Sequence, residues 1–174
     1  MKTALGLFAE APWSARFGFV VIIVYVFFAV FAPLLTPYSE SQIVASEFEP
    51  WGGEFIFGTD NLGRDMYTRI IYGGRNTIGI AFLTTCLAFF IGGFAGFVSA
   101  TLGGWVDQGM GRLVDVMMAI PQLIFALLIL TITGTSIPVL IVVIALLDST
   151  RVFRLSRAVA MNIVVMDYVE VAKL

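Results

Sequence analysis

Residues 76–106 read NTIGIAFLTTCLAFFIGGFAGFVSATLGGWV and contain no Asp, Glu, Lys or Arg. A helix crosses the hydrocarbon core of a bilayer with about 20 apolar residues, so this run is long enough to span it. The whole chain of 174 residues agrees, since 59% of its residues are hydrophobic, 13% are charged and the mean hydropathy is +0.97. Soluble domains carry about 25% charged residues. The expected fold class is therefore an all-α, polytopic membrane protein.

A polar island precedes this run, and residues 57–76 read FGTDNLGRDMYTRIIYGGRN. Asp60 or Asn61 is suited to capping a helix N-terminus, because a short side-chain oxygen accepts hydrogen bonds from free backbone amides. Gly73-Gly74 is suited to ending a helix. The pattern predicts a short helix over residues 61–72.

The two faces of this predicted helix differ in polarity. One face holds Leu62, Met66, Tyr67, Ile70 and Ile71, and the other holds Arg64, Asp65, Thr68 and Arg69. Asp65 and Arg69 have the i, i+4 spacing of an ion pair. Such a helix directly before an apolar span is typical of one lying along a membrane surface. The alternative is a surface helix of a soluble domain, which the following span disfavours.

Apolar segmentation predicts four membrane helices. The predicted order is a cytoplasmic N-terminus at 1–16, a first span at 17–35, an outer loop at 36–76, a second span at 77–103, a turn at 104–110, a third span at 111–133, a turn at 134–135, a fourth span at 136–155 and a cytoplasmic segment at 156–174. Pro121 is expected to kink the third span, because proline removes a backbone hydrogen bond. The fourth span must include Asp148 and Arg151, which should face protein or the interface.

Basic residues set the predicted orientation. The inner segments hold seven basic residues, namely Lys2, Arg16, Arg112, Arg151, Arg154, Arg157 and Lys173. The outer loop holds three, namely Arg64, Arg69 and Arg75. Basic residues prefer the cytoplasmic side, so both termini are expected to be cytoplasmic. Arg151, Arg154 and Arg157 are spaced like anchors at anionic headgroups. Small residues at Gly92, Gly96, Ala100 and Gly104 predict a stripe where a neighbouring helix approaches closely.

The composition excludes several functions. Cys86 is the only cysteine and there is no histidine, so we expect no disulfide, metal centre or cofactor. The net charge of −2 offers no basic patch for nucleic acid. The only lysines are Lys2 and Lys173, and the chain has no Gly-rich phosphate-binding loop, so ATP hydrolysis would require a partner. Two alternatives stay open: an intramembrane aspartyl enzyme using Asp115 and Asp148, and a non-transporting membrane scaffold.

Three motifs together resemble the C-type permease subunits of bacterial dipeptide, oligopeptide and nickel ABC importers. The first is the signature formed by Gly58, Thr59, Asp60, Gly63, Arg64, Asp65, Arg69, Gly73 and Arg75. The second runs from Asp115 to Ile120-Pro121. The third is Tyr168-Val169-Glu170-Val171-Ala172, which is similar to the start of the family's ATPase-coupling loop, with Val171 where Ala is usual.

The resemblance implies a six-helix permease fold in the bacterial inner membrane, without enzymatic activity of its own. It also implies three kinds of partner: a second permease subunit, cytoplasmic ATP-binding subunits and a periplasmic solute-binding protein. Tyr168, Val169, Glu170, Val171 and Ala172 would contact the ATPase. Because the family has two further helices, we expect the native polypeptide to be longer than 174 residues.

Overall fold

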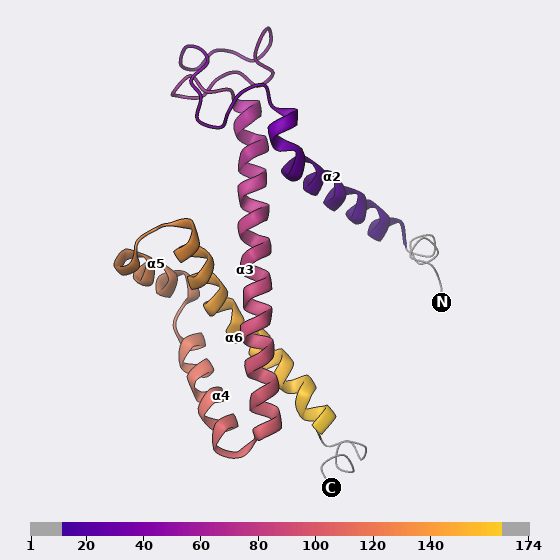
Figure 1. Ribbon diagram of the computed structural model, residues 1–174, viewed down its shortest axis with the longest axis vertical. Coiled ribbons are helices and arrows are strands. Elements are labelled where there is room, and N and C mark those ends of the chain that lie inside the picture. Colours follow the sequence, from indigo (N-terminus) through magenta and orange to yellow (C-terminus); the bar gives the residue numbers. More distant parts are fainter. Residues whose placement is uncertain (1–11, 165–174) are drawn as a thin grey trace. The chain divides into compact units, whose positions relative to one another are not determined.

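The computed structural model describes residues 12–164, which form five helices (Figure 1). They are α2 (Trp13–Leu35), α3 (Met66–Leu102), α4 (Gly104–Ala119), α5 (Gln122–Thr133) and α6 (Ile137–Val164). Within these residues there is no strand, only three isolated β-bridges. The chain divides into two compact units, residues 1–79 and 80–174. The predicted coupling residues, Tyr168–Ala172, lie outside the described part of the chain.

The first unit begins with α2, which starts four residues before the predicted span and ends at the predicted Leu35. Pro33 lies in its last turn, and the backbone amide and hydroxyl of Thr36 both donate to the carbonyl of Ala32, at 3.2 and 2.9 Å. These bonds close the helix end where the chain turns into the polar connection.

The prediction of a separate helix over residues 61–72 is wrong. Residues 61–65 form turns and bridges, and the helix begins at Met66. Gly73-Gly74 does not end it, because α3 continues for 37 residues to Leu102 (Figure 1). A helix of that length measures about 55 Å, well beyond the hydrocarbon thickness of about 30 Å. The amphipathic segment is therefore the first turns of a long helix rather than a helix of its own.

In the second unit, the predicted third span is two helices. α4 ends at Ala119 and α5 begins at Gln122, and their axes differ by 91°. Pro121, where a kink is predicted, is the N-cap residue directly before α5. α4 also begins seven residues earlier than predicted, at Gly104. Gly104 therefore belongs to α4, and the small-residue stripe on α3 ends at Ala100.

The helix α6 packs closely against α3 at two glycines of that stripe. A Cβ on Gly92 would lie 2.3 Å from the carbonyl oxygen of Ser149, and one on Gly96 would lie 2.7 Å from that of Phe153. Phe153 is only 2% exposed. The close approach expected from the stripe is therefore present at Gly92 and Gly96.

By length and composition, two helices of the described residues qualify as membrane spans, α2 and α3. The bent pair α4 and α5 qualifies as a third when its two helices are taken together. α6 runs nine residues beyond the predicted end of the fourth span, from Ile137 to Val164. The fold is thus a helical membrane architecture with two or three candidate spans.

Candidate functional site

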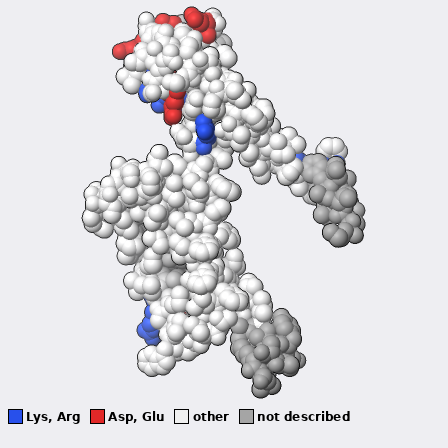
Figure 2. Space-filling view, in the orientation of Figure 1, with Lys and Arg blue, Asp and Glu red and all other residues white. Residues whose placement is uncertain are grey.

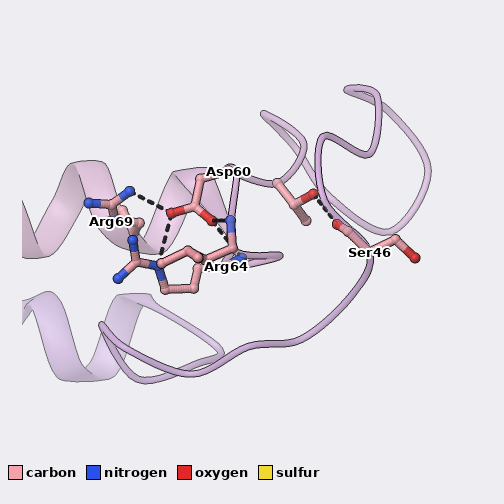
Figure 3. A network of polar contacts seen from close by, with 6 residues as sticks. Ser46, Asp60, Arg64 and Arg69 are labelled. Carbon is pink, nitrogen blue, oxygen red and sulfur yellow. Dashed lines mark hydrogen bonds and ion pairs between the residues drawn. The ribbon is translucent and has the colours of Figure 1, made fainter.

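The connection between α2 and α3 is folded around one carboxylate, that of Asp60 (Figure 3). Its Oδ1 accepts hydrogen bonds from the backbone amides of Leu62 and Arg64, at 2.8 and 3.0 Å. Its Oδ2 accepts from the Arg64 Nε at 2.9 Å and from the Arg69 Nη1 at 2.6 Å. The Asp60 side chain is only 6% exposed. We call Asp60, Leu62, Arg64 and Arg69 the Asp60 network.

These contacts decide the charge of Asp60. Burial favours the protonated form, but the hydrogen bonds from the Arg64 and Leu62 amides and from the Arg64 guanidinium favour the carboxylate more strongly. They lower the pKa of Asp60 from 3.8 to about 2. The carboxylate is ionised at neutral pH, and its oxygens are occupied by partners within the chain. The network therefore fixes the shape of the connection and occupies both oxygens of the Asp60 carboxylate.

Thr59 extends this network to the preceding residues. Its hydroxyl donates to the carbonyl of Ser46 at 2.7 Å and accepts from the backbone amide of Glu49 at 2.8 Å. The Thr59 side chain is buried. Residues that are 10 and 13 positions earlier in the chain are thereby held against the start of α3.

Two signature glycines are required by the backbone. Gly58 and Gly63 both have φ of +70°. A Cβ on Gly58 would lie 2.3 Å from the carbonyl oxygen of Glu49, and one on Gly63 would lie 2.0 Å from that of Ala45. Only glycine tolerates both the left-handed conformation and this close approach.

Asp65 caps α3, although the sequence predicts it as the partner of Arg69. Its Oδ2 accepts from the backbone amide and the hydroxyl of Thr68, at 2.8 and 2.6 Å, and both residues are buried. Arg69 binds Asp60 instead. Gly73 and Arg75 lie farther along α3, and within the described residues no ion pair or hydrogen bond links them to the Asp60 network. The structure thus brings together seven of the nine signature residues.

The surface of the connection is acidic. Figure 2 shows acidic side chains gathered there, and the connection contains Glu40, Glu47, Glu49 and Glu54 with no Lys or Arg before Arg64. Large apolar side chains are exposed among them, including Trp51 at 84% and Phe48 at 71%. Aromatic residues are enriched in surfaces that contact another protein, so the exposed rings favour such a contact.

A second buried aspartate, which the sequence does not single out, lies in the second unit. Asp107, in the first turn of α4, accepts a hydrogen bond from the hydroxyl of Ser99 at 2.7 Å. Both of its carboxylate oxygens bind the guanidinium of Arg157 on α6. We call Ser99, Asp107 and Arg157 the Asp107 clamp, since it joins α3, α4 and α6. The sequence gives one weak indication of this site, since Asp107 is the first charged residue after the uncharged run at 76–106.

The three arginines on α6 have partners within the protein. Arg157 was expected to anchor at headgroups, but it pairs with Asp107. Arg151 donates to the Gln122 side chain at 2.9 Å. Arg154 remains largely exposed, 3.9 Å from the carboxylate of Asp115.

The two carboxylates of the alternative enzyme hypothesis have separate partners. Asp115 is 67% exposed beside Arg154, whereas Asp148 accepts from the Gln122 side chain at 2.9 Å. An aspartyl dyad needs two carboxylates close enough to share a proton. No contact between these two exists within the described residues, which disfavours this chemistry.

Two family models of membrane transport proteins match parts of this chain. Residues 88–174 match the model of a family described as "Binding-protein-dependent transport system inner membrane component", and residues 13–50 match "N-terminal TM domain of oligopeptide transport permease C". The dipeptide transport system permease protein DppC of Alkalihalophilus pseudofirmus is 30% identical, over 95% of this chain and 58% of its own length.

Two further relatives are similar. A putative peptide transport system permease protein of Brucella suis is 33% identical, over 92% of this chain and 54% of its own length. The peptide transport system permease protein SapC of Haemophilus influenzae is 35% identical, over 71% of this chain and 44% of its own length. The chain thus spans about half the length of the curated relatives it matches. On these matches, the chain belongs to the family of binding-protein-dependent transport system inner membrane components.

Proposed function

We propose that this chain acts as a permease subunit of an ATP-driven importer for peptides or related small solutes. The observation that carries the proposal is the family match over residues 88–174, together with the folded signature around Asp60. The relatives are named as permeases of dipeptide and peptide transport, which supports a peptide as the cargo.

The importer would contain three further kinds of subunit. A second permease would complete the translocation pathway within the bilayer. Cytoplasmic ATP-binding subunits would supply the hydrolysis for which this chain has no phosphate-binding loop. A periplasmic solute-binding protein would deliver cargo to the acidic connection, where Trp51 and Phe48 are exposed.

In this proposal the chain crosses the inner membrane four times, with both termini in the cytoplasm. The spans would be α2, α3, the bent pair α4–α5, and α6. The charges on α6 argue against a span facing lipid, but contacts with protein reduce their cost. Arg157 pairs with Asp107, and Arg151 and Asp148 both bind Gln122.

Residues 168–172 would couple ATP hydrolysis to transport. The support is that α6 leads toward them and that the Asp107 clamp holds its last turns to α3 and α4. A helix held in this way transmits movement at one end to the membrane segment. Glu170→Ala and Ala172→Trp should separate hydrolysis from uptake, whereas Asn162→Ala on exposed α6 surface should not.

The test is uptake of tritiated alanyl-phenylalanine by bacterial cells that lack their own peptide permeases. The complete permease carrying this chain would be expressed with its partner subunits. We expect ATP-dependent uptake, and co-purification of an ATP-binding subunit with the permease. A membrane scaffold would give co-purification without uptake, and an aspartyl enzyme would give neither. Either result would refute the proposed function.

A further inference from the structure

The break between α4 and α5 interrupts the backbone hydrogen bonding of a candidate membrane span. Ile120, between Ala119 and Pro121, is extended, with ψ of 132°, and is 39% exposed. Irregular backbone at membrane depth is tolerated only where protein buries it or where it lines a water-filled cavity. A cavity of about 140 Å³ lies against this break. It is lined by Met117, Met118, Ile120, Pro121, Gln122, Leu147, Thr150 and Arg151.

A chain of polar side chains lies beside the same break. The Gln122 Nε2 donates to the Asp148 Oδ1 at 2.9 Å, and the Gln122 Oε1 accepts from the Arg151 Nη2 at 2.9 Å. Asp148 and Arg151 are three residues apart, so they lie on one face of α6. One neutral amide thus bridges a carboxylate and a guanidinium. We call Gln122, Asp148 and Arg151 the helix-break cluster.

The position of this cluster along α6 is informative. Asp148 lies 11 residues after Ile137, which is about 16 Å along a helix and about halfway across a hydrocarbon core of about 30 Å. Charged groups at such depth face protein or a water-filled cavity, and they commonly mark the path of a substrate. Among the residues that the structure describes, the exposed Arg151 is bonded through one nitrogen, which leaves its other donors available for a ligand.

We propose that the helix-break cluster is a contact site for cargo on an aqueous path through the membrane. The ligand class is a zwitterionic solute of peptide size. Arg151 binds its carboxylate and Asp148 its ammonium group, while Gln122 holds the two side chains apart when no cargo is present. The inference rests on the proposed transport function and names the residues of this chain that meet the solute.

Cysteine labelling in the assembled importer tests whether water reaches the site. With Cys86→Ser as background, Gln122→Cys should react with a charged, water-soluble thiosulfonate, and its reactivity should change when ATP hydrolysis is trapped with vanadate. Leu127→Cys is the matched control, because Leu127 is an exposed apolar residue of the same helix. It should stay unlabelled if it faces lipid or protein.

Uptake of tritiated alanyl-phenylalanine at saturating solute-binding protein tests the contact itself. Loss of one charged hydrogen-bonding partner should lower the maximal rate about tenfold in Arg151→Gln. Arg151→Lys should recover most of the rate because it keeps the charge. Arg154→Gln, one turn away, should stay within about twofold of the wild type, as expected for an exposed and weakly paired arginine. The amount of assembled complex is measured for all three variants, and each uptake rate is expressed per assembled complex.

Three outcomes overturn the site alone. The first is a Gln122→Cys variant that stays unlabelled in every nucleotide state. The second is an Arg151→Gln variant that transports as fast as Arg154→Gln. The third is an Arg151→Lys variant that transports no faster than Arg151→Gln, because the rate would then not depend on the positive charge. Absence of uptake by the wild-type importer would overturn the proposed function together with the site.

Discussion

Asp60 and Asp107 are both buried aspartates held by arginine, but they are built in different ways. Within the described residues, every side-chain hydrogen bond of the Asp60 carboxylate comes from a residue within nine positions of it along the chain. The partners of Asp107 lie 8 and 50 residues away, on two other helices. The Asp60 network is formed by residues of one contiguous motif, whereas the Asp107 clamp requires α3, α4 and α6 to pack together.

The Asp60 network and the Asp107 clamp are therefore stabilised by different interactions. The Asp60 network is formed within one connection, where Gly63 and Thr59 hold the turn close to Ala45 and Ser46. The Asp107 clamp depends on Gly96, which lets α6 approach α3 and brings Arg157 within reach. A change in helix packing should therefore disrupt the clamp and spare the network.

The largest loss of stability is expected from a substitution that disrupts the Asp107 clamp and leaves the Asp60 network intact. Gly96→Val would force a Cβ to 2.1 Å from the Ser156 hydroxyl and 2.7 Å from the Phe153 carbonyl. Such overpacking should destabilise the protein by about 3 kcal/mol, measured as unfolding in detergent. Gly93→Val is the matched control, because nothing lies within 4 Å of its Cβ position. Equal stability of the two variants would show that α3 and α6 do not pack at Gly96.

A smaller effect is expected when the clamp alone is removed. Asp107→Asn should destabilise the protein by about 2 kcal/mol, less than the about 3–5 kcal/mol for a fully buried pair, because the Arg157 side chain is 33% exposed. Asp115→Asn should change the stability by less than about 1 kcal/mol, since both members of its pair are more than 60% exposed. The same unfolding assay measures both. A loss of stability in Asp115→Asn as large as that in Asp107→Asn would contradict the distinction between the exposed pair and the clamp.

The smallest effect on the whole protein is expected from Asp60→Asn, because its consequences stay local. Cleavage within residues 36–65 by a protease should become about tenfold faster, while unfolding of the helices should change little. Glu47→Gln, at an exposed acidic residue of the same segment, should cleave like the wild type. A slower or unchanged cleavage of Asp60→Asn would show that the network does not hold this connection.

The pH dependence sharpens the same test. The folded pKa of Asp60 is about 2, below its ordinary 3.8, so its contribution to stability is full above about pH 4 and is lost as pH falls through 2. Pepsin cleaves over this range. The difference in cleavage rate between the wild type and Asp60→Asn should therefore shrink from pH 4 to pH 2. A difference that stays constant over that range would contradict the assigned charge.

The local region was also the one that sequence analysis predicted in part. The signature residues Gly58–Asp65 lie around Asp60 in the structure, and the positive φ of Gly58 and Gly63 and the capping by Asp65 give backbone reasons for these residue types. Gly73-Gly74 predicts a helix end that the structure does not have, because a pair of glycines destabilises a long apolar helix by less than the packing of that helix stabilises it. The Asp65–Arg69 spacing predicted a pair, but Asp60 competes for Arg69 from a folded turn that helix periodicity does not describe.

Most of the contacts between α3, α4, α5 and α6 could not be predicted from the sequence. The stripe at Gly92 and Gly96 predicted a close helix contact but not its partner, so Arg157 could not be assigned to Asp107. Pro121 predicted an interruption, but not a change of direction of 91°. Gln122 was not singled out, because a lone glutamine after a proline carries no pattern until α6 lies beside it.

The proposed sidedness of the membrane arrangement is the central claim, because it would put the Asp60 connection outside and residues 156–174 inside. The direct measurement is labelling of Glu47→Cys, in a Cys86→Ser background, with a membrane-impermeant maleimide on bacterial cells whose outer membrane has been opened. The account predicts full labelling before the inner membrane is permeabilised, and labelling of Arg112→Cys only afterwards. Labelling of Glu47→Cys only after permeabilisation would contradict it.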